Sequence, residues 1–71
     1  MNALPRYTYQ LLFTKREGIP EIVEHVSEAD ARSHFALFGM DDADVYLSIT
    51  LQKIDWFADE VQTLDTLEFP A

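Results

Sequence analysis

The alternation of residues 45–52 constrains the fold of this chain more than any other feature of the sequence. Every second residue is aliphatic, and the four residues between them all carry hydroxyl or amide side chains. A period of two places the aliphatic side chains on one face of a β-strand and the others on the opposite face. We therefore expect a half-buried strand here, in a sheet whose core lies on one side: Val45, Leu47, Ile49 and Leu51.

Residues 7–14 alternate in the same way and predict a second half-buried strand. A further strand is expected over residues 21–26, with Ile22 and Val26 facing the core. The two segments are separated by a stretch of about five residues that includes a glycine and a proline. This arrangement is typical of a β-hairpin with a loose loop.

The sequence predicts one helix, over residues 28–38. Ser27 is suited to cap its first turn, because a serine side chain accepts a hydrogen bond from a free backbone amide there. Gly39 is expected to end the helix in the left-handed conformation. Within the helix, three apolar residues fall on a single stripe that would face the sheet: Ala31, Phe35 and Phe38.

The last third of the chain allows two structures. Phe57, Val61 and Leu64 have helical spacing, whereas residues 61–69 are rich in threonine and in other residues that favour strands. We expect a second hairpin that turns near residues 58–59, with a helix over 56–64 as the alternative.

Together these elements predict an α+β fold of the order ββαββ: a four-stranded antiparallel sheet with one helix packed on one face. Residues 1–71 are expected to form a single small domain. The expected core is formed by apolar side chains of the first three strands and of the helix: Tyr9, Leu11, Phe13, Ile22, Val26, Ala31, Phe35, Phe38, Val45, Leu47, Ile49 and Leu51.

Small domains usually need reinforcement beyond their hydrophobic core. Disulfides are excluded because the chain has no cysteine. Two exposed edge strands would also present unpaired backbone groups to other chains. For both reasons we expect a homodimer.

The charges are distributed unevenly along the chain. Residues 1–40 carry five acids and four bases, whereas residues 41–71 carry eight acids and one base, within a total net charge of −8. Such a surface repels nucleic acids and anionic membranes and attracts basic proteins. We therefore expect a basic protein partner, and no direct contact with nucleic acid or membrane.

No pattern in the sequence indicates catalysis, a cofactor or a metal site. His25 and His34 are the only histidines, and without cysteine they do not complete a zinc site. Residues 41–44 are rich in aspartate but lack the ligand spacing of a calcium loop. Gly18 and Gly39 are the only glycines, which leaves no glycine-rich loop for phosphate. The expectation is a protein that is not an enzyme.

The sequence also bears on location. Its first residues lack the charged and apolar regions of a signal peptide, and no apolar run approaches the length of a membrane span. Together with the absence of cysteine, this predicts a cytoplasmic protein.

From these features we expect a non-enzymatic, acidic protein-binding module. One form of this hypothesis is an inhibitor that mimics nucleic acid and occupies a basic, nucleic-acid-handling protein. In general character such a chain is similar to accessory proteins of phages and other mobile elements, although no motif identifies a family. The alternative is a structural or assembly subunit that self-associates or joins a larger complex.

The candidate partner-binding residues are the acids of the last 31 residues together with two neighbouring aromatic residues that could anchor a partner. A second candidate surface is the polar face of the sheet around Thr8, Gln10, Ser48 and Thr50. The candidates of the acidic surface are Asp41, Asp42, Asp44, Asp55, Trp56, Phe57, Asp59, Glu60, Asp65 and Glu68.

Overall fold

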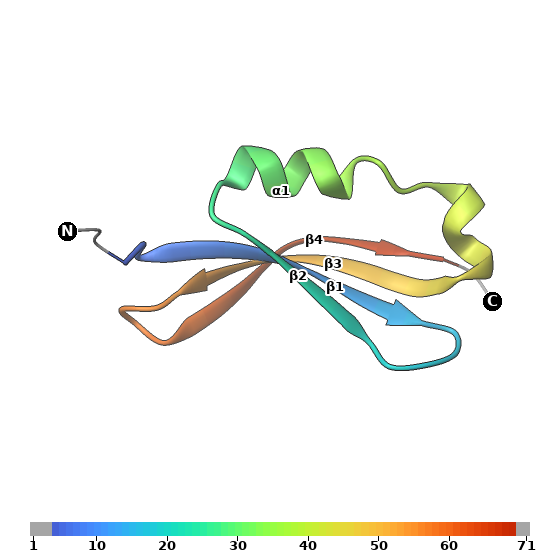
Figure 1. Ribbon diagram of the computed structural model, residues 1–71, viewed down its shortest axis with the longest axis horizontal. Helices are drawn as coiled ribbons and strands as arrows, with labels where there is room; N and C mark the ends of the chain where they lie inside the picture. Colours follow the sequence, from blue (N-terminus) through green and yellow to red (C-terminus); the bar gives the residue numbers. More distant parts are fainter. Residues whose placement is uncertain (1–3, 70–71) are drawn as a thin grey trace.

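The computed structural model describes residues 4–69 and shows an α+β fold of the order ββαββ, with one α-helix above one face of an antiparallel sheet (Figure 1). The strands follow one another across the sheet in the order β2-β1-β3-β4, so β2 and β4 are its edges. The elements are β1 (Tyr7–Lys15), β2 (Glu21–His25), α1 (Glu28–Phe35), the 3-10 helix η1 (Met40–Asp44), β3 (Tyr46–Asp55) and β4 (Glu60–Glu68).

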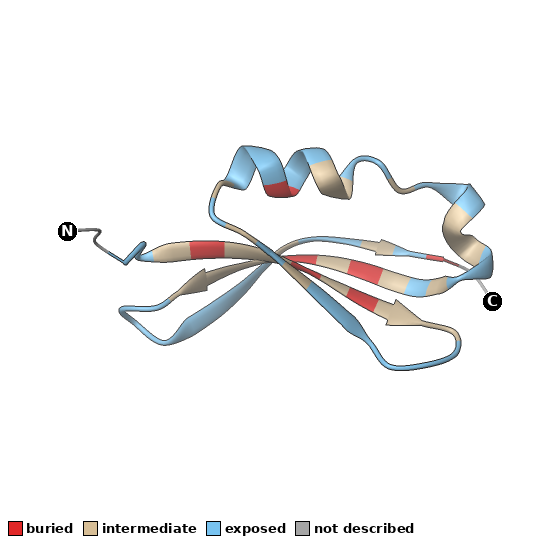
Figure 2. Ribbon diagram, viewed as in Figure 1, coloured by how far each residue is buried: buried red, intermediate tan, exposed pale blue. Residues whose placement is uncertain are grey.

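The two alternating segments of the sequence form the central strands, β1 and β3. Leu11 pairs with Leu51 and Phe13 pairs with Ile49, and all four side chains are buried beneath α1 (Figure 2). Paired residues of an antiparallel ladder share a face, so these four side chains form one apolar layer. The period of the sequence therefore determines which side of the sheet carries the core.

The cap and the apolar stripe place α1 as the sequence predicts. The Asp30 amide donates a hydrogen bond to Ser27 Oγ at 3.3 Å, which satisfies one of the free amides of the first turn. Ala31 is fully buried against the sheet, and Phe35 and Phe38 pack against the core while remaining partly exposed. The helix thus contacts the sheet through Ala31 and Phe35, and Phe38 continues the contact beyond its end.

The end of the helix differs from the prediction. α1 ends at Phe35, and the chain continues through a turn in which the Leu37 amide bonds to the His34 carbonyl at 3.1 Å. Gly39 does not adopt the left-handed conformation, because its φ is −158° and its backbone is extended. Asp42 accepts a hydrogen bond from the Gly39 amide at 2.9 Å, and the acidic segment that follows forms η1.

The predicted core residues of β2 are wrong by one position. Val23 pairs with Leu11 and packs against the core. Because successive side chains of a strand point to opposite faces, Ile22 lies on the other face and is 61% exposed. Val26 lies beyond the end of the strand and is 73% exposed.

The beginning of β3 also departs from the predicted alternation. The pairing of β1 with β3 shifts at a bulge that leaves Leu47 without a partner. As a result Tyr46 turns toward the core, where its ring lies 5.3 Å from that of Phe13. Val45 and Leu47, both expected in the core, are exposed.

The last segment forms a hairpin, as expected, rather than a helix. β3 and β4 are joined by residues 56–59, and Asp59 adopts a left-handed backbone with a φ of 55°. Aspartate tolerates this conformation better than most residues do. The pairing of β3 with β4 also shifts after Leu51, which leaves Leu64 as an extra residue that packs against the core.

Both helical elements are short. α1 has eight residues and η1 has five, whereas crossing a bilayer takes about 20. Within residues 4–69, no helix is long and apolar enough to span a membrane.

Candidate functional site

The structure separates the predicted site residues into two groups at opposite ends of β3. This strand has ten residues, which corresponds to about 33 Å, and the whole molecule is 45 Å long. η1 lies at one end of the molecule, and the turn between β3 and β4 lies at the other (Figure 1). The first group is Asp41, Asp42 and Asp44, and the second is Asp55, Trp56, Phe57, Asp59 and Glu60.

The remaining two candidates lie on the edge strand β4. Glu68 pairs with Ser48, close to the beginning of β3, and therefore belongs to the end that carries η1. Asp65 pairs with Leu51 near the middle of the strand. The candidate acids are thus concentrated at the two ends of the molecule, and Asp65 lies between them on the edge strand β4.

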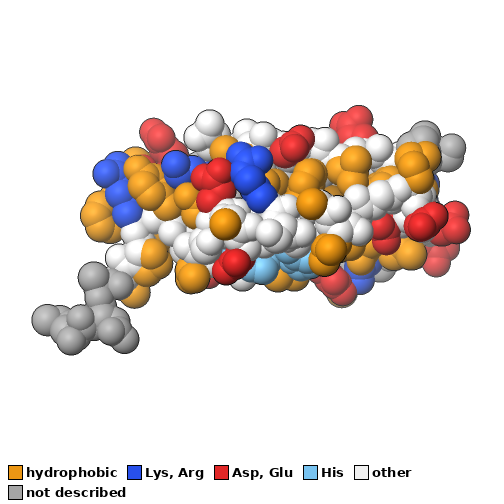
Figure 3. Space-filling model, turned by 90° about the horizontal axis from the view of Figure 1, so that it is seen from above, with side chains coloured by type: hydrophobic (Ala, Val, Ile, Leu, Met, Phe, Trp, Pro, Cys, Tyr) orange, Lys and Arg blue, Asp and Glu red, His pale blue; other side chains and the backbone are white. Residues whose placement is uncertain are grey.

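We call the end that carries η1 the acidic end; it comprises residues 37–47 with Glu17 and Glu68. Acidic side chains gather at this end of the molecule in Figure 3. The Asp42 carboxylate accepts a hydrogen bond from the Gly39 amide, whereas the Asp41 and Asp44 carboxylates form no hydrogen bond or ion pair with any residue from 4 to 69. Their carboxylates are available to a partner.

Large apolar side chains are exposed at the acidic end as well. Leu37 and Met40 are 79% and 73% exposed, and Val45 and Leu47, which follow η1 in the chain, are exposed as well. Sequence reasoning did not select Leu37 or Met40 as site residues. The sequence does indicate that Leu37 could be exposed, because Leu37 does not belong to the apolar stripe of Ala31, Phe35 and Phe38 that faces the sheet.

The loop between β1 and β2 reaches the acidic end. The Arg16 amide donates to the Val45 carbonyl at 3.0 Å, and the Arg16 guanidinium donates to the Ala43 carbonyl. A hollow of about 400 Å³ lies here, lined by Arg16, Glu17, Asp44 and Val45. Arg16 therefore fastens η1 to the sheet, and Glu17 adds a carboxylate to this surface.

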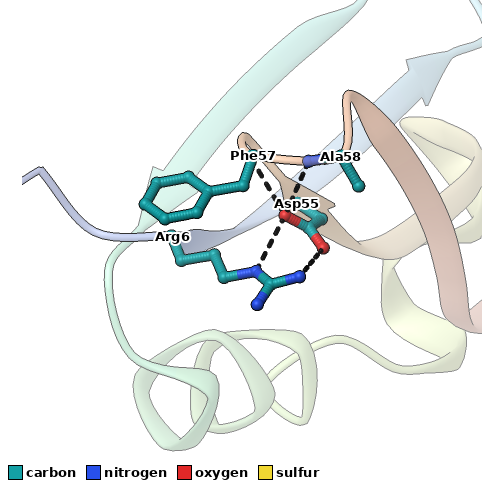
Figure 4. A network of polar contacts seen from close by, with 4 residues as sticks. All are labelled: Arg6, Asp55, Phe57 and Ala58. Carbon is teal, nitrogen blue, oxygen red and sulfur yellow. Dashed lines mark hydrogen bonds and ion pairs between the residues drawn. The ribbon is translucent and has the colours of Figure 1, made fainter.

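The opposite end, which we call the turn end, is built around Asp55 (Figure 4). Its carboxylate accepts hydrogen bonds from Arg6 at 3.2 and 3.1 Å, and from the amides of Phe57 and Ala58 at 3.0 and 3.1 Å. These bonds fix the turn and fasten it to the residue before β1. Asp55 is therefore a structural residue of the turn and not a free carboxylate.

Trp56 and Phe57 are the exposed aromatic residues of the turn end, at 55% and 72% exposure. The Trp56 indole Nε1 donates to Thr8 Oγ1 at 2.8 Å, so the ring lies across the beginning of β1. An open groove of about 390 Å³ is lined by Leu4, Pro5, Thr8, Glu24, Trp56 and Phe57.

Two bases lie among the acids of the turn end. The Arg6 guanidinium is 5.5 Å from the centre of the Phe57 ring, and Lys53 Nζ is 4.2 Å from the centre of the Tyr7 ring. Arg6 also forms an ion pair with Asp55. The turn end is therefore closer to electrical neutrality than the acidic end.

The ion pair affects how Asp55 titrates. The hydrogen bond from Arg6 is the main cause that lowers the pKa of Asp55 below its usual range, and the amides of Ala58 and Phe57 act in the same direction. In the unfolded chain this carboxyl titrates near ~3.9. The folded state therefore holds the proton less tightly than the unfolded state does.

We predict that the contribution of Asp55 to stability depends on pH in the acid range. It should be fully present above the unfolded pKa of ~3.9 and be lost as the pH falls through the lower folded pKa. Asp55→Asn keeps an oxygen that can accept from the turn amides but removes the charge. Urea denaturation should show a constant stability difference between the wild type and Asp55→Asn from pH 7 to about 5. That difference should shrink below about pH 4, and a difference that is independent of pH down to the lowest values would contradict this role.

The structure also brings together the two histidines, which come from different elements. His25 Nε2 and His34 Nδ1 are 3.0 Å apart, so one imidazole donates a hydrogen bond to the other. The His34 ring also packs against Phe13 and Phe38. This pair joins the end of β2 to α1. Within residues 4–69, no group of three or more His, Cys, Asp or Glu side chains is placed to hold a metal ion.

No protein-family model, curated protein or solved structure matches this chain. An assignment of function therefore depends on the geometry and charge of the two ends and of the sheet.

Proposed function

We propose that this protein is a non-enzymatic module that binds a basic protein through its acidic end. The observation that carries this proposal is the combination of free carboxylates and exposed apolar side chains at one place. The carboxylates of Asp41 and Asp44 have no hydrogen-bond or ion-pair partner within residues 4–69, and Met40 beside them is 73% exposed.

The two kinds of side chain have complementary roles in binding. Charges at the rim of an interface speed the encounter of the partners, whereas buried apolar side chains slow their separation. The turn end has exposed aromatic residues, but Arg6 and Lys53 reduce its attraction for a basic protein. We therefore favour the acidic end over the surface around Trp56 and Phe57.

Inhibition of a nucleic-acid-handling protein is a more specific form of this proposal. Residues 41–71 carry seven net negative charges, which over the 45 Å length of the molecule correspond to about one per 6 Å, against one per ~1.7 Å in duplex DNA. One copy is thus too sparsely charged to imitate a phosphate backbone, and mimicry would require two copies side by side. Recognition of a basic protein has no such requirement.

Affinity capture from the native cells, washed over a series of salt concentrations, tests the proposal. We expect a basic protein that is retained at low salt and released as salt screens the interaction, from about 0.05 M to about 1 M. Recovery of the chain alone, with no partner at any salt concentration, would support the alternative of a self-associating structural subunit. A partner held unchanged at the highest salt would contradict an electrostatic role for the acidic end.

A further inference from the structure

The sheet face opposite α1, which we call the open face, is covered by no other element of residues 4–69 (Figure 1). The pairing of Gln10 with Gln52 identifies this face, because their side chains form a hydrogen bond of 2.7 Å while Leu11 and Leu51 point to the core. The side chains that β1 and β3 place here are all uncharged, and Thr8 among them is buried beneath Trp56. The others are Gln10, Leu12, Thr14, Ser48, Thr50, Gln52 and Ile54.

Apolar side chains extend the open face onto both edge strands. Ile22 of β2 lies beside Leu12, and Val61 of β4 lies beside Ile54. Ile22 and Val61 are each 61% exposed. An apolar contribution from all four strands is unusual for a face that only contacts water, and it is typical of a face that packs against a second layer.

The charge of the open face indicates what can cover it. Of the thirteen acids in the chain, the strands place only Glu24 and Glu68 on this face, and these lie on opposite edges. A basic protein finds little to attract it here. A second copy, which carries the same net charge of −8, meets less repulsion on this face than at the acidic end.

We propose that a second copy of this chain packs on the open face, sheet against sheet, to form a symmetric dimer. A two-fold dimer needs a face that is complementary to itself, and an uncharged, mixed apolar and hydroxyl face meets this requirement. The longest strand of the sheet has ten residues, or about 33 Å, and four strands side by side are about 19 Å wide, so the face covers at most roughly 630 Å² in projection. Specific interfaces begin at about 600 Å² on each partner, so the open face is of the size that a small dimer interface needs.

Sedimentation equilibrium up to several hundred micromolar, at low and high salt, tests this inference. The dimer should tighten as salt rises, because salt screens the repulsion between two acidic bodies. Binding of a basic protein should weaken under the same change, so the two proposals fail independently. A monomer at every concentration and salt, or a dimer that dissociates as salt rises, would overturn the inference.

Variants on the two faces of β4 locate the interface. Thr66 lies on the open face beside Thr50, whereas Gln62 lies on the face that carries α1. Thr66→Glu should weaken the dimer at least about tenfold, which corresponds to ~1.4 kcal/mol of repulsion, while Gln62→Glu should leave it unchanged. Thr50→Glu, at the centre of the face, should act in the same direction, with circular dichroism confirming that each variant is folded. Equal effects of Thr66→Glu and Gln62→Glu would place the contact at the edge of β4 and refute a face-to-face dimer.

Discussion

Phe13→Ala is expected to destabilise the protein by about 3–5 kcal/mol. The Phe13 side chain is 3% exposed, and its ring contacts those of Phe38 and Tyr46 at 5.1 and 5.3 Å. It is therefore the residue at which β1, β3 and the segment after α1 meet. A domain of 71 residues has a total stability of about 4–11 kcal/mol, so this single change should remove a large part of it.

Leu37→Ala is the matched control for this prediction. It also truncates a large apolar side chain in the region of Phe38, but Leu37 is 79% exposed. Its stability should stay within about 0.5 kcal/mol of the wild type. Urea denaturation of both variants makes the comparison, and similar losses of stability in the two would show that the aromatic cluster is not the centre of the core.

The sequence predicted those parts of the fold that depend on local rules. Ser27 and the stripe of Ala31, Phe35 and Phe38 identified α1, because capping and helical periodicity involve residues a few positions apart. The alternation of residues 45–52 identified β3 for the same reason.

The errors occur where distant segments determine the outcome. Ile22 and Val23 are adjacent and both apolar, so only the pairing of Val23 with Leu11 decides which one is buried. At Leu47 the bulge against β1 reverses the local alternation. Gly39 was expected to end the helix, but it is extended and its amide bonds to Asp42.

The candidate surface was predictable only in part. The excess of acids in the last 31 residues is visible in the sequence, but their division between two ends depends on the length and direction of β3. The neutralising contact of Arg6 with Asp55 joins residues 49 positions apart and leaves no local signal. For the same reason the neighbourhood of Leu37, Met40 and Asp44 emerges only from the fold.

Charge reversal at the acidic end is expected to have the second large effect. Asp41→Lys with Asp44→Lys should slow association with the captured basic partner by about tenfold at low salt and flatten its salt dependence. The carboxylates of these two acids form no hydrogen bond or ion pair within residues 4–69, so the fold should tolerate the change. Asp42 is left intact because it binds the Gly39 amide.

The matched variant makes the same change of charge at the other end of the molecule. Asp59→Lys with Glu60→Lys alters the net charge equally, about 33 Å away along β3, beside the turn that carries Trp56. Because Asp59 has a left-handed backbone, circular dichroism and urea denaturation are used to check that this variant is folded. Met40→Ala and Trp56→Ala extend the comparison to the apolar anchors. The variant that lacks the anchor used by the partner should dissociate from it about 30-fold faster, as expected for a loss of ~2 kcal/mol.

The measurement that tests the account most directly is the pair of association and dissociation rate constants of these four variants with the captured partner. We predict slow association for the variant at Asp41 and Asp44, fast dissociation for Met40→Ala, and nearly wild-type rates for both variants of the turn end. Slow association for the variant at Asp59 and Glu60 together with fast dissociation for Trp56→Ala would contradict the account and place the binding site at the turn between β3 and β4.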